Sequence, residues 1–281
     1  MNIFIRRDGG DLLDTIKEII YDHIHYRKQI LQLAKSDLIK TYTGAAFGWA
    51  WGIIKPTVTI FVFWFAFTIG LRHGDPQNGY PFFLWLIAGF IPWFFMRDSI
   101  TSGAGSIRKY KYLVQRIKYP VDTIPTFVVL SQLFTNLALT LIMMVIYMVF
   151  GFMPTIYYLQ IPLFYLMALF FFTCWALFSA MLSSMSKDFF NLVKSAVPPL
   201  FWLSGILYSP ERIENHHTIR AILMFNPVTI IVNGFRNSFV YHKWFWETPL
   251  LLRNYCIVTV IMIVLAVWAY RKLKKEIPDV L

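Results

Sequence analysis

The chain has 281 residues, of which 57% are hydrophobic and 15% are charged, with a net charge of +11 and a mean hydropathy of +0.55. This composition excludes an ordinary soluble enzyme, because soluble domains carry roughly 25% charged residues. It also disfavours a nucleic-acid partner, since Lys and Arg concentrate in short segments between apolar runs, where membrane topology alone requires them. We therefore expect an integral membrane protein.

Residues 11–40 precede the first apolar run and have the pattern of an amphipathic helix. Apolar residues such as Leu12 and Ile16 recur at helical spacing, and charged residues occupy the other faces. We expect this helix to lie in the cytoplasmic interface of the membrane, among the lipids; packing on a soluble partner is the alternative. The Gly44-x-x-x-Gly48 pattern that follows is either a helix-packing notch or a hinge into the membrane.

Six apolar runs predict an all-α integral membrane protein with six transmembrane helices in a single domain. A bilayer core of roughly 30 Å requires about 20 apolar residues in a helix. The runs are 56–71, 80–96, 123–150, 161–185, 189–208 and 254–270. Spans one to five therefore fall within 53–208 and span six within 250–270. Arg97 and Asp98 follow the second run and are expected to pair locally.

The basic residues between the runs predict the side of the membrane on which each segment lies. Lys and Arg number eight in 1–55, one in 72–79, six in 97–120, none in 151–160 and four in 271–281. Because basic residues in short loops stay in the cytoplasm, both termini and the 97–120 loop are expected inside. The long 209–249 segment then lies outside, although it carries four basic residues.

The basic loop at 97–120 contains a predicted docking helix over 107–118. Proline disfavours the helical conformation of the residue before it, so the helix is expected to stop before Pro120. A solvated positive loop would explain the charge. It would not explain the regular spacing of Tyr112, Leu113, Arg116 and Ile117, which favours a docking element for a partner.

The segment 212–246 is too interrupted to be an ordinary span. Two amphipathic stretches are separated by Asn226-Pro227, and at 1.5 Å per residue neither crosses a bilayer alone. We expect a short re-entrant helical hairpin that enters the outer side of the membrane and returns before the last span.

Neither a metal site nor a catalytic site is predicted. Cys174 and Cys256 belong to separate spans, where buried, inert thiols are expected. The His23-x-His25 pair has i, i+2 spacing, which places the two rings on different faces of a helix. No Cys or carboxylate completes a ligand set around it.

Four motifs, in order along the chain, resemble type-2 ABC exporters. Thr41-Tyr42-x-Gly44-x-x-x-Gly48-Trp49-x-Trp51-x-x-x-Lys55-Pro56 looks like the start of their first span. Tyr112-Leu113-Val114-x-Arg116-Ile117-x-Tyr119-Pro120 is similar to their coupling helix, with Tyr119 in place of the usual Phe. Ser204-Gly205-Ile206-Leu207-Tyr208 and Asn226-Pro227…Arg236 resemble their late signatures. The chain is most similar to the polysaccharide exporters, and among them to teichoic acid permeases of the TagG/TarG kind.

The resemblance implies a homodimer in the bacterial cytoplasmic membrane, with each permease bound to a separate ABC ATPase. It also implies a polyprenyl-pyrophosphate-linked glycan as cargo, with wall teichoic acid as the first expectation. O-antigen, capsule or a small lipid or drug are the alternatives. The chain has no G-x-x-x-x-G-K-[ST] phosphate loop, so ATP and Mg²⁺ are expected on the partner subunit and no cofactor on this one.

The expected contacts with the ATPase lie in the docking helix, with apolar plugs flanked by steering charges. The plugs are Tyr112, Leu113 and Ile117, and the remaining members of the set are Arg108, Lys109, Arg116, Lys118 and Tyr119.

The expected glycan pathway is lined by aromatic rings, which hold sugars weakly through flat faces. The candidates are Phe61, Trp64, Phe65 and Phe67 in the first span, and Phe201 and Trp202 in the fifth. Lys194 is expected either to reach the cytoplasmic headgroups or to contact the lipid pyrophosphate. Arg236 in the outer hairpin either pairs with Glu211, Glu214 or another backbone end, or acts in gating.

A membrane-embedded glycosyl- or acyltransferase is the alternative from another class. Such chemistry requires converging carboxylates or a histidine base near the membrane surface. The outer carboxylates Asp75, Glu211, Glu214 and Glu247 are few and scattered, which disfavours it.

Overall fold

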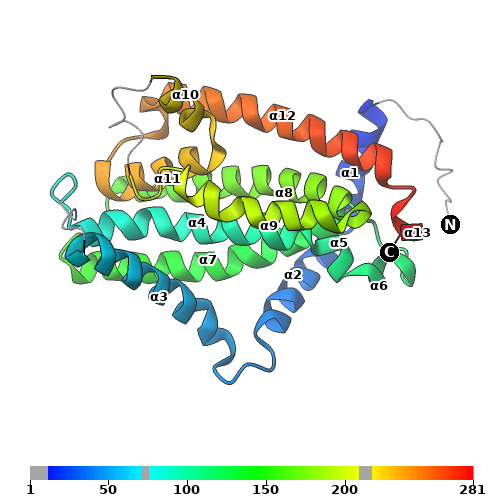
Figure 1. Cartoon of the computed structure of the whole chain (residues 1–281), viewed down its shortest axis with the longest axis horizontal. Coiled ribbons are helices and arrows are strands. Elements are labelled where there is room, and N and C mark those ends of the chain that lie inside the picture. Colours follow the sequence, from blue (N-terminus) through cyan, green and yellow to red (C-terminus); the bar gives the residue numbers. More distant parts are fainter. Residues whose placement is uncertain (1–11, 71–75, 209–216, 281) are drawn as a thin grey trace.

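The computed structural model describes residues 12–70, 76–208 and 217–280, and this part of the chain is almost entirely helical. The long helices of the bundle lie along the longest axis of the molecule (Figure 1). They are α4 (Phe82–Ala104), α7 (Thr123–Val149), α8 (Ile161–Met185), α9 (Lys187–Trp202) and α12 (Pro249–Leu273). The predicted all-α membrane fold is confirmed.

Helix α4 forms the centre of this bundle. Its residues are buried on every face, and they contact α7, α8, α9 and α11 (Pro227–Arg236). A helix that is apolar all round is typical of one surrounded by other helices. Close approach to α8 depends on Gly103, where an added Cβ would lie 2.6 Å from the Cβ of Ala176. Small residues of this kind allow membrane helices to pack backbone to backbone.

Within the described residues, five helices are long and apolar enough to cross a membrane. They are Gly48–Gly70, Phe82–Ala104, Thr123–Val149, Ile156–Met185 and Pro249–Leu273. These helices overlap the predicted spans one to four and six, but the first begins at Gly48 and the last extends beyond 250–270 at both ends. The second is longer than predicted, because the helix continues for eight residues beyond position 96.

The predicted fifth span at 189–208 differs from the structure. Helix α9 has only 16 residues and ends at Trp202. Pro198 and Pro199 lie inside its last turns, where their missing N–H donors weaken the backbone ladder. The chain then turns at Gly205, which has a positive φ of 62°. By length and composition α9 is not one of the five candidate spans.

The predicted break at Asn226-Pro227 is present. Helices α10 (His217–Phe225) and α11 are bent by 83° there, and α11 continues as a π-helical turn over Asn237–Tyr241. The Asn226 side chain caps α11 by accepting from the Val228 N–H (2.9 Å), and it donates to Ser204 Oγ (2.9 Å). The bent pair fits a re-entrant hairpin and equally a sixth, broken span. Asp75, Glu211 and Glu214 lie outside the described residues.

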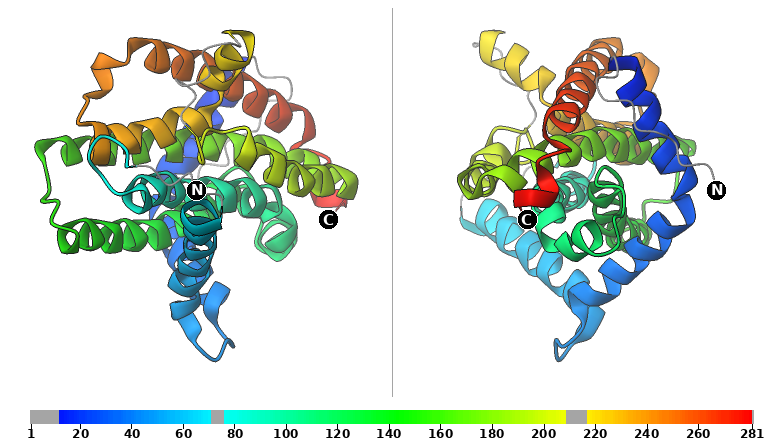
Figure 2. Two further views of the ribbon diagram at one scale, coloured as in Figure 1. Left: turned by 60° about the vertical axis from the view of Figure 1, so that its left-hand side comes forward. Right: turned by 90° about the vertical axis from the view of Figure 1, so that its right-hand side faces the viewer.

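The predicted N-terminal helix at 11–40 is two helices, α1 (Leu12–His25) and α2 (Arg27–Tyr42). The chain breaks at Tyr26, whose backbone angles (φ −93°, ψ 12°) leave the helical range. Helix α2 packs against α7 through Ile30 and Ala34, which are buried. Together α1 and α2 wrap the bundle from the outside (Figure 2).

After α2 the chain forms an elbow over 43–50 and enters α3 (Trp51–Phe65). Figure 2 shows this elbow protruding from the body of the molecule. It exposes Phe47 and Trp49. In the most apolar part of the span to which α3 belongs, only 11% of the residues are buried, and the others are half-buried or exposed in the described chain.

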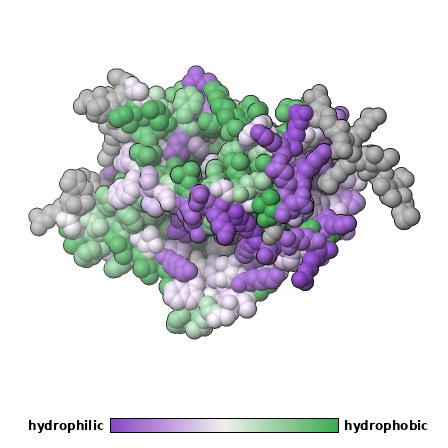
Figure 3. Space-filling view, turned by 45° about the vertical axis from the view of Figure 1, so that its right-hand side comes forward, coloured by the Kyte–Doolittle hydropathy of each residue, from purple (hydrophilic) through white to green (hydrophobic). Residues whose placement is uncertain are grey.

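The predicted docking helix over 107–118 is two short helices, α5 (Ser106–Lys109) and α6 (Lys111–Gln115). They are separated at Tyr110 (φ −110°, ψ 28°), and Lys118 has a positive φ of 55°. We call the end of the bundle that holds α5, α6 and α13 (Ile277–Val280) the basic end. Hydrophilic side chains gather over this end, whereas the opposite half is mostly hydrophobic (Figure 3).

Candidate functional site

The α5–α6 segment is fixed to α2 by a buried carboxylate. Asp37 follows Ile30 and Ala34 on the buried face of α2 and is fully enclosed. It accepts hydrogen bonds from Lys109 Nζ (2.6 Å) and from the Tyr110 hydroxyl. Burial, followed by the bond to Asp37, raises the pKa of Tyr110 and keeps its phenol a donor. These two bonds join the α5–α6 segment to α2.

A second contact fixes the same segment to α8. Arg108 donates to the Ser184 carbonyl at 3.3 Å, near the end of α8. Arg108 and Lys109 were predicted as steering charges for a partner; the structure engages both within the chain.

The other predicted coupling residues separate into a buried and an exposed group. Leu113 is 5% exposed and Tyr119 is 8% exposed, and both pack in the core of the basic end with residues of α7. The exposed group consists of Tyr112, Arg116, Ile117 and Lys118. Ile117 is 60% exposed, so of the predicted plugs it offers the largest apolar surface to a partner, with Tyr112 beside it.

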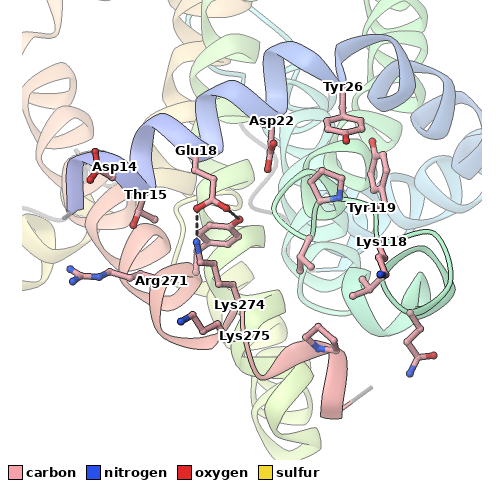
Figure 4. Close-up of a pocket in the computed structure, with 16 residues that line it drawn as sticks. Asp14, Thr15, Glu18, Asp22, Tyr26, Lys118, Tyr119, Arg271, Lys274 and Lys275 are labelled. Carbon is pink, nitrogen blue, oxygen red and sulfur yellow. Dashed lines mark hydrogen bonds and ion pairs between the residues drawn. The ribbon is translucent and has the colours of Figure 1, made fainter. Parts of the chain in front are cut away.

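A cavity of about 1130 Å³ lies next to this segment, between α1, residues 114–121 and the end of α12 (Figure 4). Acidic side chains enter it from α1, and basic side chains enter it from the opposite wall. Glu18 bridges the two walls: its Oε2 lies 2.5 Å from Lys274 Nζ, and its Oε1 accepts from the Tyr270 hydroxyl at 3.4 Å. This bridge joins α1 to the end of α12.

His23 attaches α1 to the start of α7. Its Nε2 lies 2.7 Å from Thr126 Oγ1, and its Nδ1 lies 3.5 Å from the buried carboxylate of Asp122. Burial lowers the pKa of His23, but Asp122 and the Ile19 carbonyl outweigh burial, so the pKa is raised. In the sequence, His23 was considered only as a metal ligand, and this contact was not predicted.

The predicted pathway aromatics of the first span divide in the same way. Phe61 and Phe65 are exposed on α3, by 56% and 50%. Trp64 and Phe67 are half-buried and pack edge-on or tilted against Phe83 and Phe82 of α4, with ring centroids 6.2 Å apart in each case. The open surface of α3 therefore carries two of the four rings.

In α9, Trp202 is exposed and Phe201 is buried. Phe201 packs between α3 and α4, with ring centroids 5.3 Å from Phe63 and 5.5 Å from Phe90. Phe63 was not among the predicted residues, although it joins α3 to α9. Lys194 is exposed and lies over the Phe190 ring, 4.4 Å from its centroid.

Arg236 is fully buried at the end of α11. It donates to the Gly205 carbonyl (2.7 Å) and to the Ile206 carbonyl, and its guanidinium stacks 3.4 Å over the Trp85 ring. Gly89 makes room for it, because an added Cβ there would lie 2.7 Å from Nη2. Arg236 thus joins α11, α4 and the turn after α9 at one point.

The model of a protein family described as ABC-2 type transporter matches residues 28–240. The chain belongs to this family. The matched region of this ABC-2 chain begins in α2 and ends in the turn that follows α11. It therefore includes Asp37, the α5–α6 segment and Arg236, whereas α12 lies beyond it.

Two relatives of this chain are both named O-antigen export system permease protein RfbA. The relative from Myxococcus xanthus is 25% identical over 226 residues, which cover 80% of this ABC-2 chain and 85% of the relative. The relative from Klebsiella pneumoniae is 23% identical over 213 residues, which cover 75% of the chain and 80% of the relative.

Some site residues gave no clear signal in the sequence. Ile30, Ala34 and Asp37 form one buried face at i, i+4 and i+7, so an acidic residue on an apolar stripe was the available sign. Asp122 is the N-cap of α7, a position where a carboxylate is common and indicates no particular function. Only the fold of this ABC-2 chain brings His23 to it.

Proposed function

We propose that this chain is the permease of an ATP-driven exporter that moves a lipid-linked polysaccharide of the O-antigen type across the bacterial cytoplasmic membrane. The observation that carries the proposal is the family match over 28–240, together with two relatives named as O-antigen export permeases. These relatives favour O-antigen over wall teichoic acid, the first expectation from the sequence. The cargo moves from the inner to the outer leaflet, linked to a polyprenyl pyrophosphate.

The proposed energy source is a separate ABC ATPase, which binds ATP and Mg²⁺ and contacts the basic end. Ile117 and Tyr112 supply its apolar contact, and Arg116 and Lys118 supply the charged rim. Asp37 and Arg108 hold the segment to α2 and α8, so a push from the ATPase reaches both helices as one movement. In this arrangement both termini and the basic end are cytoplasmic.

The proposed pathway uses the open surface of α3 and α9. A single copy leaves Phe61 and Phe65 exposed on a candidate span and Trp202 exposed at the end of α9. Two copies that face each other through these helices would enclose a path lined by aromatic rings. The functional unit is accordingly proposed as a homodimer with two ATPase subunits.

The proposal is tested by export in cells. The chain is expressed with an ABC ATPase in a bacterium that lacks its own O-antigen permease, and surface O-antigen is measured. Wild type is expected to restore it. Ile117→Asp should reduce export and ATPase co-purification at least about tenfold, because it places a charge in an apolar contact.

Gln115→Asp is the matched control, since it adds the same charge to an exposed position two residues away. It should leave both readouts within about twofold of wild type. Restored export that is unaffected by Ile117→Asp would refute the assigned coupling surface. No export with any ATPase, but turnover of lipid-linked sugars by the chain alone, would refute the permease and support the transferase.

A further inference from the structure

A second cavity, of about 560 Å³, lies between the end of α2, the first part of α3, α4, α5 and α7. Its lining contains polar residues from three helices that are otherwise apolar: Lys55 of α3, Arg97, Asp98 and Ser102 of α4, and Gln132, Thr135 and Asn136 of α7. Polar and ionisable side chains within membrane spans are costly, and where they converge they mark a ligand or ion site. Neither the coupling surface nor the aromatic pathway explains this convergence.

The cavity has an excess of positive charge. Lys55, Arg97 and Lys109 line it, against the single carboxylate of Asp98. Asp98 is already bound to Arg97, at 2.7 Å and 3.1 Å, and Lys109 is bound to Asp37. No carboxylate in the described chain lies within ion-pair distance of Lys55, which is exposed at the mouth of the cavity.

Aromatic rings support two of these cations. Lys55 Nζ lies 5.8 Å from the centroid of the Trp51 ring, and the Arg97 guanidinium lies 5.2 Å from that of Phe94. Both rings also line the cavity, as does Tyr42. The Trp51 ring thus supports Lys55 without neutralising it, whereas the charge of Arg97 is shared with Asp98.

The position of the cavity favours a ligand that arrives through the membrane. It lies between three candidate spans, and α3, which forms one wall, exposes Val58, Phe61 and Val62. A lipid can place its headgroup among the cations while its chains run along α3. A soluble anion would have no apolar surface to match.

We propose that this cavity binds the phosphate-bearing headgroup of a membrane lipid, with Lys55 as its principal contact. A phosphate or pyrophosphate group supplies the missing negative charge and accepts from Lys55, Arg97 and Lys109 together. Gln132 and Thr135 supply polar contacts at its edge. The lipid is either the pyrophosphate carrier of the cargo, in which case the inference rests on the proposed function, or an anionic phospholipid of the bilayer, in which case it does not.

The test is native mass spectrometry of the purified full-length chain in detergent with three added lipids. These are a polyprenyl pyrophosphate, a phosphatidylglycerol and a diacylglycerol, which has no phosphate. Lys55→Gln is expected to weaken binding of at least one phosphate lipid about tenfold, the loss of one charge-assisted contact. Lys55→Arg should retain that binding. Thermal stability reports whether each variant is folded.

Lys272→Gln is the matched control. Lys272 also lies over an indole ring, 5.5 Å from the Trp268 centroid, but it does not line the cavity. It should bind all lipids as wild type does. A selective loss of polyprenyl pyrophosphate identifies the cargo carrier as the ligand, and a selective loss of phosphatidylglycerol identifies a bilayer lipid.

The inference is overturned if folded Lys55→Gln binds both phosphate lipids as wild type does. It is also overturned if diacylglycerol binds with equal affinity and loses binding in the same way. Because this assay needs neither ATP nor an ATPase, its failure is separate from a failure of export.

Discussion

Helices α3 and α4 belong to candidate spans of equal length, 23 residues each, yet they occupy opposite environments. In the most apolar part of the α4 span, 83% of the residues are buried inside the chain. In the α3 span the share is 11%, although α3 is the more apolar of the two. In a membrane, lipid is as apolar as a leucine side chain, so hydropathy does not distinguish core from surface. Close packing does: α4 carries Gly89 and Gly103 at contacts with its neighbours, and α3 shows its aromatic rings to the outside. Helix α4 therefore packs in the core of the fold, whereas α3 presents side chains to the surroundings of the chain.

Replacing one ring in each helix gives the largest expected difference. Phe90→Ala in α4 removes a fully buried ring and should lower the free energy of unfolding by about 3–5 kcal/mol. Phe61→Ala in α3 should lower it by less than about 1 kcal/mol, since the ring is mostly exposed, but should reduce polysaccharide export. Denaturation in detergent measures the first quantity and surface O-antigen the second. Equal destabilisation by the two changes would contradict the assignment of α3 as an uncovered helix.

Side chains added at two glycines, Gly89 in α4 and Gly70 at the end of the α3 span, compare the same two helices. An added Cβ at Gly89 would meet Arg236 at 2.7 Å and the Ile206 carbonyl at 3.3 Å, whereas nothing lies within 4 Å at Gly70. Gly89→Leu is expected to cost about 1–3 kcal/mol through overpacking, and Gly70→Leu about 0.5 kcal/mol or less. Melting temperatures in one detergent compare them directly. A stable Gly89→Leu variant would show that the Arg236 junction is loosely packed.

Asp37→Asn extends the comparison to the basic end, where polar contacts replace aromatic packing. The amide keeps the shape of the carboxylate but loses its charge toward Lys109 and Tyr110. We expect a loss of stability of about 1–2 kcal/mol and ATP hydrolysis that is less coupled to export. Asp279→Asn, in the exposed α13, is the control. Unchanged coupling in Asp37→Asn would remove α2 from the proposed transmission.

The smallest expected effect concerns pH and His23. Its pKa is raised in the folded chain above the ordinary 6.5, so the protonated ring stabilises the attachment of α1. This contribution is complete below the unfolded pKa and is lost as the pH rises through the folded pKa. Hydrogen exchange of α1 amides should therefore quicken between about pH 6 and pH 8 in wild type. In His23→Gln it should follow only the intrinsic pH dependence; an equal extra rise in both would contradict the role of the Asp122 contact.

The sequence predicted those parts of the fold that depend on the length of apolar runs. The run at 161–185 coincides with α8, and that at 123–150 ends one residue after α7, because long apolar helices bounded by polar residues leave little freedom. The prediction of a span over 189–208 differs from the structure, because Pro198, Pro199 and Gly205 shorten the helix inside an apolar stretch.

The candidate site was less predictable, for a physical reason. An apolar residue at helical spacing is equally suited to the core and to a partner. The pattern that included both Leu113 and Ile117 could not say that the first is buried and the second exposed. Contacts between distant segments, such as Asp37 with Lys109, are set by how helices cross. Lys55 was predicted only as part of a motif, because its cavity is formed by five helices together.

The most direct test of the account is ATP-dependent transport in proteoliposomes that contain this chain and an ABC ATPase. A lipid-linked O-antigen is supplied to the side that carries the ATPase, and its appearance in the opposite leaflet is measured. The account predicts transport that requires ATP, is lost with Ile117→Asp and persists with Gln115→Asp. Transport without ATP or without the ATPase, or none when both subunits are folded and bound, would contradict it.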